Sequence, residues 1–183
     1  MRLDELNQAS VDEFVEQLGG IFEHSPWVAE RVAAQRPFAS VDALHAVMCA
    51  AVASADENLQ MALICAHPQL AGKAAIRGEL TASSTNEQHG AGLDHCSPEE
   101  FAEISRLNAD YDARFGFPFI LAVTGHTRSS ILADMRVRIS HRRDREVAEA
   151  LAQIGRIARF RLDALLSLSA SSQHRQPAKN RDP

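Results

Sequence analysis

The residues best suited to chemistry lie in residues 66–93, a polar stretch within a chain that otherwise has helical apolar patterning. This stretch carries two of the eight histidines, His67 and His89, together with Glu87 and a Ser-Ser-Thr-Asn run. A histidine titrates near neutral pH, so His67 can give or accept a proton, with Glu87 as its acid–base partner. Polar groups gathered between packed helices form a site more often than a core, so we predict the active site here.

Both residues also have purely structural interpretations. Pro68 disfavours helical geometry at His67, which places this histidine at a helix end, where its ring can bind a free carbonyl. Glu87 ends the pattern Ser84-Thr-Asn-Glu87, a capping box in which the glutamate satisfies a backbone donor and a helix starts at Ser84. The same pattern puts Glu87 at a helix N-terminus, which suits an anion, and the following Gln88 amide can bind ureido or imide groups.

A third candidate is an arginine near the end of the chain. The predicted last helix has an apolar stripe in steps of three and four: Val147, Leu151, Ile154, Ala158, position 161 and Leu165. Position 161 is Arg161, and a charge on a core-facing stripe is costly unless an anion meets it. Arg161 therefore forms a salt bridge with an internal carboxylate, extends outward to solvent, or binds the carboxylate of a substrate through its planar fork.

Other kinds of site are not indicated. His67, His89, Asp94 and His95 lie close in sequence but lack the spacing of a zinc site, so we expect no metal. The chain has no Gly-x-Ser-x-Gly elbow, no P-loop and no Rossmann glycine pattern after a strand.

The elements that must position these residues are helices. Capping patterns at Ser10, Ser40 and Ser97, and Ser25-Pro26 with proline at the first helical position, mark helix starts. Helices are expected over residues 11–18, 26–32, 41–53, 56–66, 70–77, 84–93, 98–115, 129–139 and 144–168. Residues 117–123 form a dense apolar run broken by proline, which predicts a buried extended segment. The sequence thus predicts an all-α fold of about eight helices.

Length and composition agree with a single compact domain over residues 1–169, followed by a disordered polar tail over residues 170–183. Apolar residues make up 45% of the 183 residues, and the formal net charge of -5 argues against nucleic-acid binding. No stretch is long enough to span a membrane, and no signal-peptide pattern opens the chain. Three cysteines without C-x-x-C spacing predict reduced thiols, so we expect a cytoplasmic protein.

Four motifs in order resemble one family, the 2-oxo-4-hydroxy-4-carboxy-5-ureidoimidazoline (OHCU) decarboxylases, and the resemblance covers about residues 11–168. The motifs are His67-Pro-Gln-Leu-Ala-Gly-Lys73, Ser84-x-x-Glu87-Gln88-x-x-Ala91-Gly-Leu93, Tyr111-x-x-Arg114-Phe-Gly-Phe-Pro-Phe-Ile120 and Ile154-x-x-Ile157-Ala-x-x-Arg161-Leu162. The resemblance implies an all-helical homodimer without metal or organic cofactor that forms (S)-allantoin in urate breakdown, part of purine metabolism.

The resemblance also assigns residues to roles. It implies that His67, Glu87 and Arg161 are catalytic, with Arg161 binding the substrate carboxylate. Substrate contacts are implied, partly through backbone groups, for Pro68, Ser84, Thr85, Asn86, Glu87, Gln88, Phe119, Ile120, Leu121, Ala122 and Val123. Where the family has a small residue and then Arg-Gly-Lys, this chain has Val123-Thr-Gly-His126, a departure that affects the rim of the site.

Two other functions stay open at this point. The same residues suit a lyase or hydrolase acting on another ureido or imidazoline acid. They also suit a non-catalytic helical binding module in which Glu87 is only a cap and Arg161 only a salt bridge.

Overall fold

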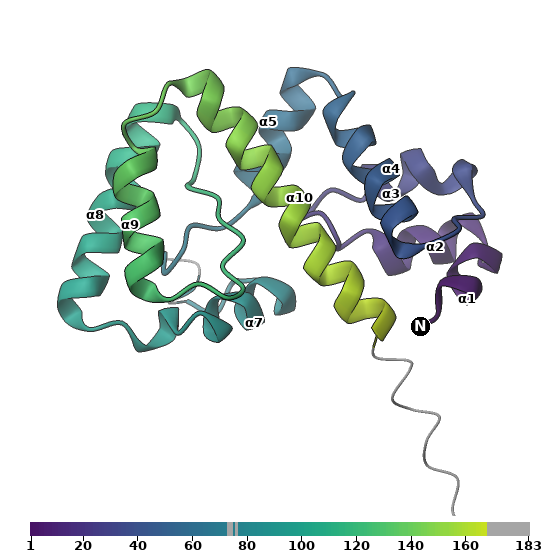
Figure 1. The fold of residues 1–183 in the computed structure, drawn as a ribbon, viewed down its shortest axis with the longest axis horizontal. Helices are drawn as coiled ribbons and strands as arrows, with labels where there is room; N and C mark the ends of the chain where they lie inside the picture. The colour runs from purple at the N-terminus through teal and green to yellow at the C-terminus, as the bar shows by residue number, and fades with distance from the viewer. Residues whose placement is uncertain (73–74, 76, 168–183) are drawn as a thin grey trace, which may run out of the picture.

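The structure is a computed structural model and describes residues 1–72, 75 and 77–167. Within these residues the regular elements are all helical, as predicted (Figure 1). The α-helices are α1 (Leu3–Gln8), α2 (Val11–Leu18), α3 (Trp27–Val32), α4 (Val41–Ala53), α5 (Glu57–Ala66), α7 (Ala82–Gly90), α8 (Pro98–Phe115), α9 (Arg128–Arg138) and α10 (Arg143–Ser167). Two short 3-10 turns, Ala33–Gln35 and Leu93–His95, complete the set.

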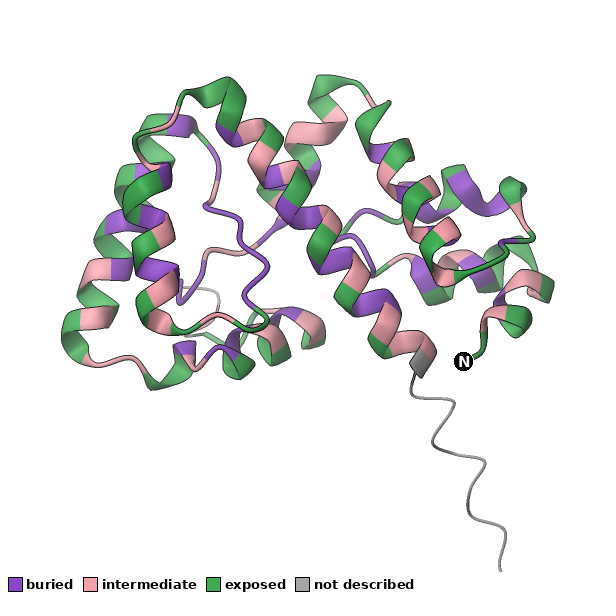
Figure 2. Cartoon of the chain, in the orientation of Figure 1, coloured by how far each residue is buried: buried purple, intermediate pink, exposed green. Residues whose placement is uncertain are grey.

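The long helix α10 organises the molecule. It runs diagonally between α1 to α4 on one side and α7 to α9 on the other, and it packs on α4 and α5 (Figure 1). Its buried positions recur every three or four residues, as the face of a helix that contacts neighbours on both sides must. Figure 2 shows this face in purple, opposite an exposed face.

Most helix starts follow the capping patterns in the sequence. The hydroxyls of Ser10, Ser40 and Ser97 accept from the backbone N–H three residues on, and Asp56 does the same for α5. Gly116 ends α8 in the left-handed conformation, with φ of 77°, where a residue without Cβ is favoured.

Some predicted boundaries were wrong. Helix α3 begins at Trp27 with Pro26 at its N-cap, so Ser25 makes no capping hydrogen bond. Helix α1 was not predicted. The prediction for residues 84–93 was wrong at both ends, because Thr81 caps α7 and the helix ends at Gly90. The prediction of a helix over 70–77 was wrong at its start, because residues 70–72 are not helical and Ala71 has a positive φ of 49°. Residues 73, 74 and 76 and the predicted tail over 170–183 lie outside the described residues.

The segment over residues 117–123 is buried and non-helical, as predicted. It leads from α8 toward α9 and is purple along most of its length in Figure 2. The rings of Phe117 and Phe119 pack edge-on against Tyr111 of α8, at centroid distances of 5.9 and 5.4 Å. This aromatic packing holds the segment in the core without regular structure.

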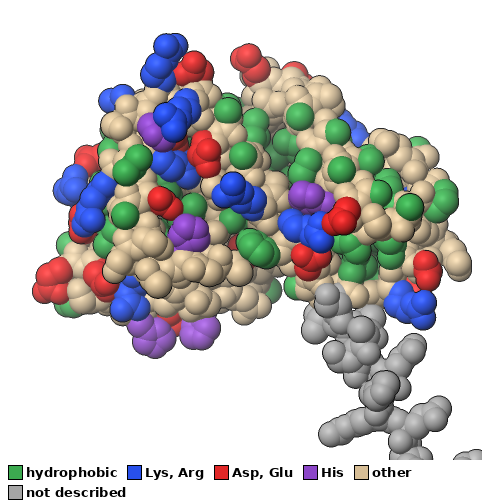
Figure 3. Space-filling view, in the orientation of Figure 1, with side chains coloured by type: hydrophobic (Ala, Val, Ile, Leu, Met, Phe, Trp, Pro, Cys, Tyr) green, Lys and Arg blue, Asp and Glu red, His purple; other side chains and the backbone are tan. Residues whose placement is uncertain are grey.

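Among the described residues, no helix is long and apolar enough to cross a membrane. Positive and negative side chains are interspersed over the face seen in Figure 3.

Candidate active site

His67 lies at the end of α5, as the following proline predicted. It is the C-cap residue, with φ of -76° and ψ of 136°, and its side chain is 6% exposed. Nδ1 lies 2.9 Å from the carbonyl oxygen of Leu63. A carbonyl can only accept, so Nδ1 carries the proton and Nε2 carries the lone pair. No described residue bonds Nε2, although this atom is buried.

Burial keeps His67 neutral. Burial is the largest influence and lowers the pKa of His67 to about 4. The Leu63 carbonyl and Glu23 raise this pKa, while Arg161 and His24 lower it, and these influences do not overcome burial. At neutral pH the ring therefore presents an unprotonated Nε2 to the cavity, which is the arrangement of a general base.

Helix α7 supplies three of the predicted side chains on one face. Its start at Thr81 makes Ser84 the third helical residue, and positions 84, 87 and 88 then lie together at helical spacing. Glu87 is therefore not the capping-box glutamate. Gln88 accepts from the N–H of Ala71 at 2.9 Å and donates weakly to the carbonyl of Gln69 at 3.4 Å, so its amide oxygen braces the turn after His67.

Arg161 lies at the centre of a buried ion-pair cluster. Its Nε and Nη2 donate to the two oxygens of Glu87 at 2.7 and 3.0 Å, and its Nη1 donates to Glu23 at 2.6 Å. Nη2 also reaches the Ser84 hydroxyl at 3.2 Å, and Nη1 the Gly20 carbonyl at 3.4 Å. All five N–H directions of the guanidinium thus meet an acceptor within the chain. Of the three interpretations of Arg161, the internal salt bridge describes this geometry.

Glu23 is the site residue that the sequence did not reveal. It lies between α2 and α3, is 2% exposed, and also accepts from the hydroxyls of Thr81 at 2.7 Å and Ser84 at 3.2 Å. Burial raises its pKa, but the hydrogen bonds from Thr81 and Arg161 outweigh burial and hold the pKa below the ordinary value. Glu23 precedes Arg161 by 138 residues, so no local spacing could have linked the two.

Two cavities meet at Glu87. The inner one, about 30 Å³, has room for one water molecule. Predicted residues that line it are His67, Pro68, Ser84, Glu87, Gln88, Phe119, Ile120, Leu121 and Val123. The outer one, about 600 Å³, is lined by Glu87, Asn86 and Arg161, and also by Thr124 and Gly125 of the departing motif.

Three predicted contact residues do not line the inner cavity: of the two cavities, Asn86 lines only the outer one, and Thr85 and Ala122 line neither. Thr85 is exposed, and its hydroxyl donates to the Thr81 carbonyl at 3.0 Å. Ala122 is buried, and its N–H donates to the side-chain oxygen of Gln153 at 3.0 Å.

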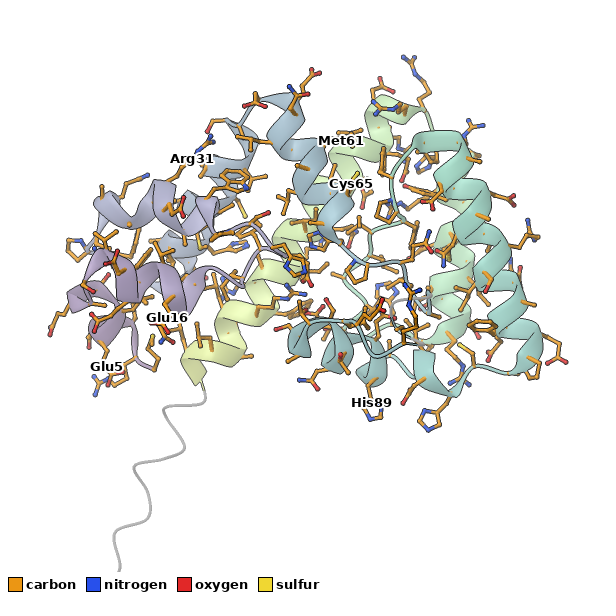
Figure 4. All side chains as sticks on the ribbon, turned by 180° about the vertical axis from the view of Figure 1, so that it is seen from behind. Glu5, Glu16, Arg31, Met61, Cys65 and His89 are labelled. Atoms are coloured by element: carbon orange, nitrogen blue, oxygen red, sulfur yellow. The ribbon has the colours of Figure 1, made fainter. Side chains whose placement is uncertain are left out.

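The histidines around residue 90 lie apart from this site. His89 and His95 both contact Asp94 at the surface, with side chains 69% and 72% exposed. Figure 4 shows His89 at the outer edge of α7. Within the described ranges, no group of three or more His, Cys, Asp or Glu side chains is arranged to hold a metal ion.

Comparison with known proteins adds to this geometry. The family model described as OHCU decarboxylase matches residues 7–163. The chain is 39% identical to an OHCU decarboxylase of Halalkalicoccus jeotgali, over 90% of this chain and 92% of that protein. It is 42% identical to the uric acid degradation bifunctional protein of Bacillus subtilis, over 93% of this chain but only 34% of that protein, about a third of its length.

Solved structures agree. A crystal structure of (S)-allantoin synthase superposes with a TM-score of 0.74 at 29% identity, covering 91% of this chain and 54% of that chain. An OHCU decarboxylase solved in the presence of (S)-allantoin superposes with a TM-score of 0.66 at 22% identity, covering 85% of this chain and 98% of that one, and so shares the fold.

Proposed function

The chain belongs to the OHCU decarboxylase family, and from this premise we propose how its residues perform the reaction. The reaction is the decarboxylation of 2-oxo-4-hydroxy-4-carboxy-5-ureidoimidazoline to (S)-allantoin in urate degradation. The carbon that bears the carboxylate also bears a hydroxyl and adjoins a C=N bond. When the bond to CO2 breaks, its electron pair moves into that C=N bond, so the ring itself accepts the electrons.

His67 is the general base in this proposal, and its free Nε2 is the observation that carries the assignment. The Leu63 carbonyl fixes the tautomer, and burial keeps the ring neutral. Nε2 accepts the proton of the substrate hydroxyl as the ring carbonyl forms and returns it to one face of the neighbouring carbon. The ring nitrogen that receives the electron pair takes its proton from solvent. Positioned proton transfer of this kind contributes about 10²–10⁴-fold to a rate.

Glu87 and Arg161 bind each other in the free protein, and in this proposal they separate so that both can bind the substrate. Because every N–H of Arg161 is engaged in the free protein, a substrate carboxylate reaches the guanidinium only if an acid partner leaves. Glu87 is the partner that moves, since its side chain is 21% exposed and lines both cavities, whereas Glu23 is 2% exposed. Glu87 then accepts hydrogen bonds from ring or ureido N–H groups, and the vacated Nε and Nη2 fork binds the carboxylate.

These roles are tested by measuring the handedness of the allantoin that forms. The substrate is generated in place from urate by upstream enzymes, and circular dichroism follows (S)-allantoin with and without the protein. We expect rapid growth of the signal, lost in His67→Asn and Glu87→Ala and kept in His89→Asn, a matched substitution at an exposed histidine. Near-full turnover by His67→Asn would refute its role.

A second outcome bears on substrate identity. Slow, racemic allantoin indistinguishable from the protein-free blank would contradict OHCU as the substrate. A panel of other ureido and imidazoline acids would then identify the acid that this site decarboxylates or hydrolyses.

We also propose that the chain acts as a homodimer in the cytoplasm. The homodimer is what the resemblance to the OHCU decarboxylases implies. The three free cysteine thiols suit a reducing compartment. Light scattering after size exclusion tests the dimer, and a single-chain mass across the working concentration range would contradict it.

A further inference from the structure

The side chains behind residues 119–123 form a buried polar cluster that the reaction does not use directly. Glu146 of α10 is 0% exposed and accepts from Nε and Nη2 of Arg138 at 3.0 and 2.9 Å. It also accepts from the Tyr111 hydroxyl and, at 2.6 Å, from Nδ1 of His141. Three donors thus fix the Glu146 carboxylate, which orients the Arg138 guanidinium more firmly than a lone ion pair would.

The other contacts of Arg138 are with residues of the cavity wall. Its Nη1 donates to the Ile120 carbonyl at 2.7 Å, and its guanidinium lies over the Phe119 ring at 4.4 Å. Gln153, about two turns further along α10 from Glu146, accepts from the Ala122 N–H at 3.0 Å. Two side chains on the core side therefore hold alternate residues, Ile120 and Ala122, of one non-helical segment.

The peptide units decide where the intervening backbone faces. The units between Ile120 and Ala122 are trans, so the C=O and the N–H of each unit point in opposite directions. The Ile120 C=O points to Arg138 and the Ala122 N–H points to Gln153. The N–H and C=O of Leu121, which belong to the same two peptide units, therefore point to the opposite side. Phe119, Ile120, Leu121 and Val123 line the inner cavity, whereas Ala122 does not. Among the described residues, no acceptor bonds the Leu121 N–H.

We propose that Arg138 and Gln153 are positioning residues, which hold Ile120 and Ala122 from behind so that Leu121 presents its N–H to the substrate. The substrate enters from the outer cavity, and the movement of Glu87, which lines both cavities, opens the inner one to it. The inference rests on the proposed function, because the ligand is the OHCU ring, whose carbonyl oxygen is the acceptor that a backbone N–H suits. This segment has no regular secondary structure, so no ladder of backbone hydrogen bonds fixes the Leu121 N–H. The side chains of Arg138 and Gln153 fix its position instead.

The test compares two amide side chains that brace backbone in the same way. Gln153→Met removes the acceptor for the Ala122 N–H. Asn7→Leu removes an amide that accepts from the Phe38 N–H at 2.8 Å and donates to its carbonyl at 2.9 Å, at the far, N-terminal end of the fold. We expect both variants to lower the melting temperature by a few degrees.

Only Gln153→Met should change function. We expect its kcat/KM to fall about 10- to 100-fold and its Kd for (S)-allantoin, measured by calorimetry, to rise by a similar factor. Asn7→Leu should match the wild type in both. Equal kcat/KM and Kd for the two variants would overturn the positioning role, whatever their melting temperatures.

A second variant guards against misfolding. Arg138→Lys keeps a cation for Glu146 but gives up the planar fork that reaches Ile120 at the same time. If Gln153→Met does not fold, Arg138→Lys is judged by the same two measurements, and wild-type values would overturn the proposal. Wild-type protein that produces no (S)-allantoin above the blank would instead refute the proposed function, and the positioning role with it.

Discussion

The buried, neutral state of His67 makes a prediction about acidity. An unperturbed histidine has a pKa near 6.5, so at pH 5.5 only about one-tenth of such rings are neutral. Burial lowers the pKa of His67 to about 4, so about 97% of its rings stay neutral at pH 5.5. If neutral His67 is the base, kcat/KM should change by less than about a tenth between pH 7.5 and pH 5.5, whereas an ordinary histidine would lose about tenfold.

Stability must be followed over the same range. The folded pKa lies below the unfolded one, so the unfolded chain binds more protons and the free energy of unfolding falls as pH drops from about 6.5 through 4. At pH 5.5 this contribution is about 1.4 kcal/mol, which lowers the melting temperature by roughly 3–6 °C. Typical domains have about 5–15 kcal/mol to lose, so the protein remains folded for the assay.

The assay is the circular-dichroism progress curve at half-unit pH steps, paired with a ¹⁵N NMR titration of the His67 ring. The NMR spectrum should show Nδ1 protonated and Nε2 bare down to about pH 5. His67→Asn should lose activity yet be less destabilised on going from pH 6.5 to 4.5 than the wild type. An acid limb in kcat/KM with a pKa between 6 and 7, matched by the NMR titration, would refute the reasoning.

Three further predictions concern the elements around the site. Arg161→Met leaves the buried Glu23 carboxylate without its cation and should lower the free energy of unfolding by about 3–5 kcal/mol. In thermal unfolding, adding Glu23→Gln to Arg161→Met should restore part of this loss, and a double variant whose two losses simply add would contradict the pairing. Thr81→Ala removes the α7 cap and a Glu23 hydrogen bond, so it should cost at least about 1 kcal/mol and lower kcat/KM, whereas Thr127→Ala, the cap of α9, should cost stability alone. Phe14→Ala, at a fully buried position of α2, should cost about 3–5 kcal/mol with kcat/KM unchanged below the melting temperature, and a lower kcat/KM there would contradict its purely structural role.

Local signals in the sequence predicted most of the helices. Ser10, Ser40 and Ser97 act as caps because a cap needs only the backbone N–H three residues on, which is a property of a few neighbouring residues. The position of Arg161 on a buried face also followed from helical spacing alone. Its partner did not, because an ion pair between distant segments leaves no trace in local periodicity.

Helix α7 shows where local signals compete. Thr81 and Ser84 are both plausible caps, three residues apart, and the sequence favoured Ser84 because Glu87 completes a capping box with it. In the folded chain the Ser84 hydroxyl is taken by Glu23 and Arg161, which lie 61 and 77 residues away. The Thr81 hydroxyl donates to Glu23 and still accepts from the Ser84 N–H, so tertiary contacts decided the register of the helix that carries the site.

The ion-pair cluster also explains how His67 stays neutral beside charged groups. Glu23 raises its pKa and Arg161 lowers it, so the pair largely offsets itself and burial decides the outcome. In the proposed mechanism the same guanidinium binds the substrate carboxylate at the outer cavity, which Arg161 and Glu87 line, next to the apolar walls of Phe119, Leu121 and Val123 in the inner one. Loss of CO2 moves the negative charge into the ring, where the Leu121 N–H can donate to the ring carbonyl and Glu87 can accept from ring or ureido N–H groups. The ring thus accepts the electron pair itself, and the residues of the chain position it and move its protons.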